Sequence, residues 1–161
     1  MQNKPRSVIL PGSYDPVTLG HQDIIRRAAQ AYAEVYAVVF VNPEKVCRFS
    51  PEERVRMLLV ATEEWDNVLV SYSTGLVIDY MRDHGIQRII KGYRNDTDLA
   101  YERVQAEWNR KMGGYETELW PCDPAYRDIS SSRVRAALDA GASVQNLVPE
   151  RVARLLTQKR P

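Results

Sequence analysis

The fold is decided by the stretch Val8-Ile9-Leu10-Pro11-Gly12-Ser13-Tyr14-Asp15-Pro16-Val17-Thr18-Leu19-Gly20-His21. Its first three residues form a short apolar run that ends at Pro11-Gly12, which is typical of a buried strand. Beyond the loop, apolar residues recur at helical spacing, at Ile24, Ile25, Ala28, Ala29 and Tyr32. This spacing predicts a helix that begins near Gly20 or His21. A strand, a loop and a helix in direct succession indicate an α/β fold.

The same alternation of strand and helix continues through most of the chain. Residues 35–41 are apolar at nearly every position, as in a strand that is covered on both faces of a parallel sheet. Ser50 and Glu53, on either side of Pro51, predict a helix start with a capping box. Further strands are predicted at residues 68–70, 88–90 and 117–120, and further helices at residues 75–84, 98–112, 131–140 and 149–158. We therefore expect a doubly wound parallel sheet of five strands with helices on both faces and a C-terminal helical extension.

The composition suits one domain, residues 1–161, with a sizeable core, because 44% of the residues are apolar. Lysine plus arginine (22) and aspartate plus glutamate (21) nearly cancel, so we expect no nucleic-acid partner. The apolar run before Pro11 is too short for the core of a signal peptide. No apolar run approaches the roughly 20 residues that span a bilayer. The expected protein is soluble and cytoplasmic, with no membrane partner.

The cysteines and histidines offer no recognisable metal site. Cys47 and Cys122 lie far apart and neither belongs to a CxxC pair, as expected for free thiols in a reducing compartment. His21 and His84 are the only histidines, and no third and fourth zinc ligand stands at a typical spacing. We predict no dedicated metal site on the protein.

Ligands of such a sheet bind beyond the carboxyl ends of its strands. The loops expected there are residues 11–20, 42–49, 71–75, 91–97 and 121–130. In the first, His21 would stand in the first turn of a helix, where free N–H groups and the helix dipole favour an anion. The same residue could instead serve only as a cap. In the second loop, Lys45 is either an anion ligand or a solvated surface residue.

The last two of these loops also combine anion-binding groups. Lys91 and Arg94 are two cations around Gly92-Tyr93, suited to phosphate. Asp98 and Glu102 follow one helical turn apart, with either a base or ribose or nearby cations as their partners. Ser130, Ser131 and Ser132 open a helix, either as a cap or as a polyphosphate cradle. The chain has neither a Walker A lysine motif nor GxGxxG, and no Ser-His-Asp or Cys-His grouping is recognisable. A P-loop kinase, a dehydrogenase and covalent catalysis are therefore not indicated.

Residues 11–21 resemble the signature of the bacterial phosphopantetheine adenylyltransferase family, which belongs to the nucleotidyltransferase superfamily. That superfamily shares an HxGH motif, and this family has Thr at its first position, as Thr18-Leu19-Gly20-His21 does. Residues 129–133 are similar to the family's second nucleotide motif. The resemblance also covers Lys45, residues 50–55, 75–79 and 91–94, Tyr101-Glu102 and Asn109-Arg110. It extends over nearly the whole chain, in order and with matching spacing.

This resemblance implies a single Rossmann-like nucleotidyltransferase domain that transfers the AMP part of ATP to phosphopantetheine. The products are dephospho-coenzyme A and pyrophosphate, and the magnesium that takes part is carried by ATP. The resemblance also implies a homohexamer and coenzyme A as a feedback ligand.

By position, the resemblance implies catalytic roles for His21, Lys45 and Arg94. The positions that match phosphopantetheine contacts are Ser13, Lys45, Val77 and Lys91. Those that match ATP contacts are Ser13, Tyr14, His21, Gly92, Tyr93, Arg94, Glu102, Tyr126, Arg127, Asp128, Ile129, Ser130, Ser131 and Ser132. The chain departs from the family in Lys91 for Arg, Asp128 for an aromatic residue and Tyr14 for Phe. Lysine keeps the charge of arginine but loses its bidentate fork.

The attacking phosphate of such a reaction is already anionic, so the protein has only to position two polyanions and neutralise charge. We expect His21 to donate to an α-phosphate oxygen and Lys45 to bridge the incoming phosphate and the α-phosphate. Arg94 and the three serines would hold the β- and γ-phosphates. One alternative is a transferase that acts on nicotinate mononucleotide or a polyol phosphate, which Thr18 disfavours. A second is a non-catalytic nucleotide-binding module. A third is a nucleic-acid adaptor, which the near-neutral charge of the chain disfavours.

Overall fold

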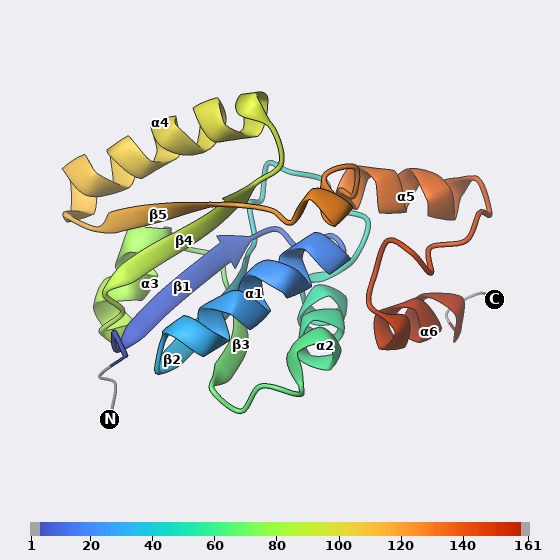
Figure 1. Cartoon of the computed structure of the whole chain (residues 1–161), viewed down its shortest axis with the longest axis horizontal. Helices are drawn as coiled ribbons and strands as arrows, with labels where there is room; N and C mark the ends of the chain where they lie inside the picture. Colours follow the sequence, from blue (N-terminus) through green and yellow to red (C-terminus); the bar gives the residue numbers. More distant parts are fainter. Residues whose placement is uncertain (1–3, 159–161) are drawn as a thin grey trace.

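Five parallel strands form one sheet in the order β3-β2-β1-β4-β5 in the computed structural model, which describes residues 4–158 (Figure 1). The strands are β1 (Ser7–Gly12), β2 (Glu34–Phe40), β3 (Val68–Ser73), β4 (Arg88–Tyr93) and β5 (Glu116–Pro121). The helices are α1 (Leu19–Ala31), α2 (Pro51–Thr62), α3 (Val77–His84), α4 (Asp96–Gly113), α5 (Ser131–Asp139) and α6 (Glu150–Gln158), with the short 3₁₀ turn η1 (Pro124–Tyr126). The predicted five-stranded α/β sheet is confirmed.

The strand order places a topological switch point beside β1. The chain runs outward from β1 through β2 to β3, then crosses back to β4 on the other side of β1 and continues to β5. The loops after β1 and β4 therefore leave the sheet in different directions and open a crevice between them. Ligands of doubly wound sheets bind in such a crevice.

Alternate residues of the central strands feed two separate cores. Val8 and Leu10 of β1 join the larger core, together with α1, α2 and α6. Ile9, between them, points to the opposite face and joins a smaller core with Met81 and Ile89. This period of two follows from the pleat of a strand. The two cores confirm that helices cover both faces of the sheet.

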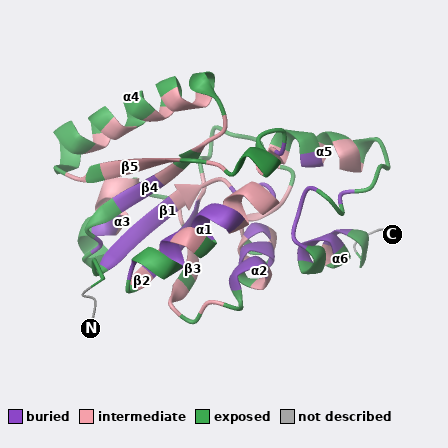
Figure 2. Ribbon diagram, in the orientation of Figure 1, coloured by how far each residue is buried: buried purple, intermediate pink, exposed green. Residues whose placement is uncertain are grey.

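The two faces are not covered equally (Figure 2). Helix α1 buries five residues, and four of them belong to the larger core. Helix α4 lies along β5 and β4, and none of its residues, all of which the structure describes, is buried. It leaves large apolar side chains exposed, namely Tyr101, Val104, Trp108 and Met112. Within its own chain, this helix therefore packs against other elements on one side only.

The C-terminal extension is confirmed as the pair α5 and α6 at one end of the sheet (Figure 1). Val152 and Leu156 of α6 are buried in the larger core, and α6 packs on α2. An ion pair between Arg151 of α6 and Glu63, the C-cap residue of α2, joins the two at their surface. Within residues 4–158, no helix is both long and apolar enough to cross a membrane.

Several elements differ from the prediction at their ends. The predicted loop 91–97 is wrong in its first three residues, because Lys91, Gly92 and Tyr93 lie in β4 and pair with β5. Likewise β3 continues to Ser73, where residues 71–75 were predicted as a loop. Polar and glycine residues hid these strand ends, because a neighbouring strand rather than local propensity keeps them extended. Helix α4 begins at Asp96, before the predicted start at residue 98, because Asn95 caps it.

Candidate active site

The loop between β1 and α1, which we call the signature loop (residues 13–18), has an unusual backbone. Tyr14 has a φ of 46°, and the Asp15-Pro16 peptide bond is cis. The Tyr14 hydroxyl donates to the carbonyl oxygen of Leu10 at 2.8 Å, and its ring lies edge-on to that of His21, 4.9 Å between centroids. Burial raises the pKa of Tyr14, so this hydroxyl keeps its proton and its hydrogen bond. The buried Tyr14 ring thus packs against the His21 ring.

His21 is fixed by an unusual capping box at the start of α1. Thr18 is the N-cap, and its hydroxyl accepts from the backbone N–H of His21 at 3.3 Å. In return, the backbone N–H of Thr18 donates to Nδ1 of His21 at 3.0 Å. Since a backbone N–H can only donate, Nδ1 must accept and the neutral ring carries its proton on Nε2. Thr18 therefore sets the His21 tautomer as well as the helix start.

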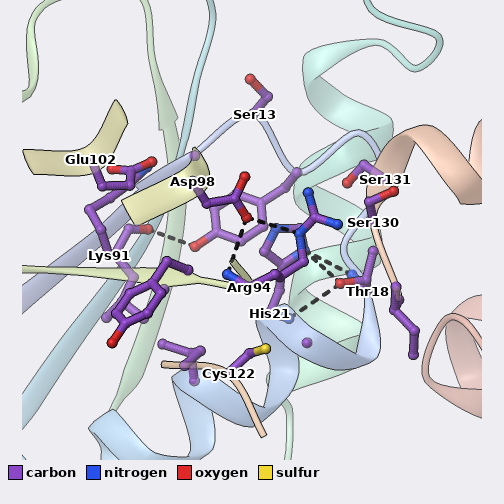
Figure 3. Close-up of a pocket in the computed structure, with 18 of the residues that line it drawn as sticks. Ser13, Thr18, His21, Lys91, Arg94, Asp98, Glu102, Cys122, Ser130 and Ser131 are labelled. Carbon is purple, nitrogen blue, oxygen red and sulfur yellow. Dashed lines mark hydrogen bonds and ion pairs between the residues drawn. The ribbon is translucent and has the colours of Figure 1, made fainter. Parts of the chain in front are cut away.

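The surroundings keep this ring neutral. Burial, together with the positive charges of Lys91 and Arg94, lowers the pKa of His21 to about 4. Near pH 7, His21, which lies among the residues that line the cleft (Figure 3), is thus an uncharged hydrogen-bond donor through Nε2. The sequence left open whether His21 caps the helix or binds an anion. The geometry allows both, because Nδ1 takes part in the cap and Nε2 remains for a ligand.

Three cations from three different loops or strands converge on the cleft. Lys45, from the β2–α2 loop, donates to the Ser13 hydroxyl at 3.1 Å. Lys91 of β4 donates to the carbonyl oxygen of Pro11 at 3.2 Å and lies 3.6 Å from Glu102. Arg94, just after β4, pairs with Asp98 at 3.1 Å. These side chains are preorganised to meet anionic groups, because each is already held in place.

Glu102 has an unsatisfied carboxylate oxygen. Its side chain is 13% exposed, and its Oε2 is buried with no hydrogen-bond partner among the described residues. Burial raises the pKa of Glu102, although the charge of Lys91 acts in the opposite direction. A buried oxygen without a donor is costly, so a ligand group that donates to it would be favoured. The sequence left open whether Glu102 meets a nucleotide or a cation, and one of its oxygens is available for each.

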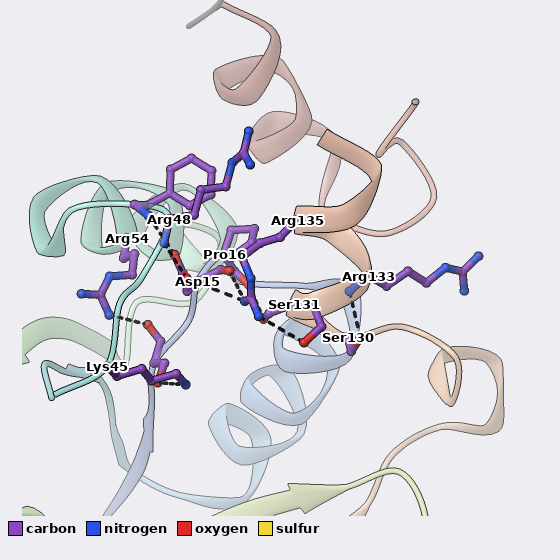
Figure 4. Close-up of polar contacts among 12 residues, drawn as sticks. Asp15, Pro16, Lys45, Arg48, Arg54, Ser130, Ser131, Arg133 and Arg135 are labelled. Atoms are coloured by element: carbon purple, nitrogen blue, oxygen red, sulfur yellow. Dashed lines mark hydrogen bonds and ion pairs between the residues drawn. The ribbon is translucent and has the colours of Figure 1, made fainter. Parts of the chain in front are cut away.

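The three serines at the start of α5 were predicted to be either a helix cap or a polyphosphate cradle, and the structure is compatible with both. Ser130 is the N-cap and accepts from the backbone N–H of Arg133 at 3.1 Å. The Ser131 hydroxyl donates to the carbonyl oxygen of Pro16 at 2.8 Å, which ties α5 to the signature loop (Figure 4). The first-turn N–H groups of α5 lack partners within the helix and lie at the edge of the cleft. The segment is thus both a cap and a donor-rich end that suits phosphate.

Most of the predicted site residues line one cleft of about 600 Å³ at the switch point. They are Ser13, Tyr14, His21, Lys45, Lys91, Gly92, Tyr93, Arg94, Glu102, Tyr126, Ile129, Ser130, Ser131 and Ser132. Arg127 and Asp128 line an adjoining cavity of about 470 Å³ instead, which shares Tyr93 and Arg94 with the cleft. Val77 is the first residue of α3 and packs against the smaller core rather than lining the cleft.

The sequence analysis gave no role to several residues that line the cleft, above all Asp15 and Arg135. For Asp98 it left open a nucleotide or a cation as the partner, and Asp98 pairs with the cation Arg94. Asp15 stands inside the signature stretch itself. Arg135 gave no sequence signal, because only the fold brings it next to the signature loop.

The comparisons with known proteins agree with this geometry. A family model described as cytidylyltransferase-like matches residues 9–137. A phosphopantetheine adenylyltransferase of Corynebacterium diphtheriae is 40% identical over 96% of this chain and 98% of its own length. Those of Streptomyces coelicolor and Thermobifida fusca are 40% and 41% identical over 96% of this chain and 97% and 94% of theirs.

The comparison with solved structures supports the fold. A protein of Vibrio parahaemolyticus, provisionally assigned as a nicotinate-nucleotide adenylyltransferase, aligns with a TM-score of 0.71. The alignment covers 96% of this chain and 93% of that one at 15% sequence identity. At this identity the likeness concerns the architecture of the sheet and its helices.

Proposed function

Because this chain belongs to the phosphopantetheine adenylyltransferase family, we propose that it transfers the adenylyl group of ATP to phosphopantetheine. The products are dephospho-coenzyme A and pyrophosphate, which makes this a step of coenzyme A synthesis. The observation that carries the proposal is the convergence of His21, Lys45, Lys91 and Arg94 with the α5 serines on one cleft. Such a site can hold two polyanions side by side.

In this proposal the phosphate of phosphopantetheine attacks the α-phosphorus of ATP directly and in line. That phosphate is already a nucleophile, so no side chain has to form a covalent intermediate. His21 donates through Nε2 to an oxygen of the α-phosphate, where negative charge develops in the transition state. Its neutral tautomer, with Nδ1 held by Thr18, supports this role. A donor that needs no reorientation stabilises the transition state without a reorganisation cost.

The cations divide between the two substrates. Lys45 bridges the incoming phosphate and the α-phosphate, and Lys91 and Ser13 bind the incoming phosphate. Arg94 and the first turn of α5 hold the β- and γ-phosphates, which leave as pyrophosphate. The free oxygen of Glu102 accepts a hydrogen bond from the nucleotide. We keep Arg127 and Asp128 as proposed nucleotide contacts through the adjoining cavity, and Val77, at the start of α3, as a proposed contact of phosphopantetheine.

We propose that magnesium enters with ATP. Within residues 4–158, no group of three or more His, Cys, Asp or Glu side chains is arranged to hold a metal ion. Hard cations such as magnesium often use substrate phosphates for much of their coordination. When bound there, magnesium would neutralise part of the charge of the triphosphate.

We also propose that the chain assembles into a homohexamer. The exposed apolar stripe of α4, which includes Val104, Trp108 and Met112, supports self-association, because large apolar patches on a surface mark contact sites. Coenzyme A, which contains the product, would compete for the same cleft as a feedback ligand. The free thiols of Cys47 and Cys122 support the cytoplasm as the location.

The test is pyrophosphate release with ATP and one acceptor at a time: phosphopantetheine, nicotinate mononucleotide or glycerol phosphate. We expect release only with phosphopantetheine, and dephospho-coenzyme A as the product identified by mass spectrometry. Release with one of the other two acceptors instead would assign a different branch of the superfamily. ATP binding without release in any mixture would favour a non-catalytic nucleotide-binding module.

A further inference from the structure

We propose that Asp15 is a positioning residue, which holds the loop that carries Lys45 against the signature loop and so sets the place of the Lys45 ammonium group. This inference rests on the proposed role of Lys45 in adenylyl transfer. It goes beyond that role because it names a second residue, which acts on the reaction by positioning Lys45.

The Asp15 carboxylate is buried and fully engaged. Asp15 is 3% exposed. One carboxylate oxygen accepts from the backbone N–H of Arg48 at 2.9 Å, and the other accepts from that of Phe49 at 3.0 Å (Figure 4). With both oxygens occupied by the neighbouring loop, the carboxylate is not free to act as a general base. In the structure, this carboxylate binds the backbone N–H groups of two consecutive residues, Arg48 and Phe49.

Those two peptide groups are the end of the Lys45 loop, residues 41–49. At the other end of this loop, the N–H of Val41 donates to the carbonyl oxygen of Ser73 at 2.8 Å, next to β2 and β3. Between the two anchors the loop is open to solvent, and the side chain of Val46 is 98% exposed. A loop with so little buried surface has little packing of its own to fix it. Its two anchored ends therefore determine where Lys45 can reach.

Asp15 also links this loop to the serine end of α5. Arg135 donates through Nη1 to the carbonyl oxygen of Asp15 at 2.8 Å and lies 3.7 Å from its carboxylate. The same guanidinium donates through Nη2 to the Ser132 hydroxyl at 3.1 Å. Charge-assisted bonds of this kind are stronger than neutral ones. Asp15 thus joins, through its carboxylate and its carbonyl oxygen, the loops that meet the two substrates in the proposed reaction.

The first test is a double-mutant cycle with Asp15→Asn and Lys45→Ala. Asparagine keeps the size of aspartate but offers one accepting oxygen for two N–H donors. We expect Asp15→Asn to lower kcat/KM by about 10–100-fold, because a small misplacement of a catalytic group can cost as much as 100-fold. In the Lys45→Ala background the same change should cost less than about 3-fold, since residues that act through one another are not additive. An equal loss in both backgrounds would overturn the proposal.

Asp139→Asn is the matched control. Asp139 forms an ion pair with the side chain of Arg48, on the same loop, but makes no contact with the Arg48 backbone that Asp15 holds. We expect less than about a 2-fold change in kcat/KM for this exposed pair. A loss as large as that of Asp15→Asn would mean that any disturbance of the loop is enough, and would overturn the specific role of Asp15.

A second test needs no activity and no variant. In the wild-type chain, the amide protons of Arg48 and Phe49 should exchange with solvent at least about 100-fold more slowly than that of Val46, because the Asp15 bonds protect them. Equal exchange at the three amides would overturn the proposal even if the enzyme is active. Protected amides in a chain that releases no pyrophosphate would instead leave the anchor standing and refute the proposed function.

Discussion

The two walls of the cleft are held in opposite ways. The wall formed by the signature loop and α1 is part of the larger core, and Ile24 and Ile25 beside His21 are buried. The wall formed by α4 carries Asp98 and Glu102, yet α4, which the structure describes throughout, buries none of its residues (Figure 2). The α1 wall is therefore complete within one chain. The α4 wall leaves large apolar side chains exposed, which the proposed self-association would cover.

In the proposed homohexamer, this difference identifies the part of the site that would depend on assembly. His21 sits on a helix whose place is fixed by its own core, so its geometry should persist in an isolated chain. Glu102, and Arg94 through its pair with Asp98, depend on a helix with little support from its own chain. The following predictions test this contrast, starting with the largest expected effect.

On the α1 wall, replacing His21 with Ala should lower kcat by about 10²–10³-fold, the range found when one oxyanion donor is removed. The dissociation constant of ATP should change little, because the donor acts mainly on charge that develops in the transition state. Steady-state kinetics combined with isothermal titration of ATP would measure both. If both change by the same factor, His21 contributes only to ground-state binding.

The contrast in packing should appear in stability. Ile25→Ala in α1 should lower the free energy of unfolding by about 2–5 kcal/mol at every protein concentration, because it leaves a cavity in a core. Trp108→Ala in α4 should act only through assembly, so its effect should depend on protein concentration. Denaturant unfolding at two concentrations and sedimentation velocity would separate the two. A concentration-independent loss at Trp108 equal to that at Ile25 would remove the distinction between the walls.

The buried state of His21 should also make stability depend on pH. Its pKa is about 4 in the folded chain and near its ordinary value of 6.5 when unfolded, so the unfolded chain takes up the proton first as the pH falls. This stability is complete above pH 6.5 and is lost as the pH falls toward 4. The difference in unfolding free energy between the wild type and His21→Gln should shrink over that window. His84→Gln, at an exposed ring, serves as the control, and an equal shift in that variant would refute the assignment to His21.

The smallest effect is expected for Lys91→Arg, which restores the residue usual in the family. Lys91 reaches the carbonyl oxygen of Pro11 and the carboxylate of Glu102 as a point charge. Arginine keeps the charge and adds a second donor, so KM for phosphopantetheine should change by less than about 3-fold. Kinetics at varied phosphopantetheine would show this. A 10-fold or larger change would mean that the cleft is shaped around lysine.

Local signals in the sequence accounted for much of the fold. The capping box of Ser50 and Glu53 was predicted because the pattern is short and self-contained. The box of Thr18 and His21 was not, since a histidine ring takes the place of the usual Glu or Gln. The strand ends at Ser73 and Tyr93 depend on pairing with other strands, which no local pattern encodes.

For the site, the sequence supplied the residue types and the fold supplied their partners. His21 and the α5 serines were found because they stand at helix starts, each within a recognisable motif. The contacts of Asp15 with Arg48 and Phe49 join residues 33 and 34 positions apart, and its contact with Arg135 joins residues 120 apart. Such pairs are invisible in one sequence, because their spacing carries no period.

In the proposed function, the two walls of the cleft form one reaction site, in which the phosphate of the acceptor attacks the α-phosphorus of ATP directly. The most direct measurement is the stereochemical course at that phosphorus, followed with ATP made chiral by sulfur and an oxygen isotope. One in-line displacement predicts inversion of configuration in the dephospho-coenzyme A that forms. Retention would require two displacements through a covalent enzyme intermediate, and would contradict the role assigned here to His21 as a donor.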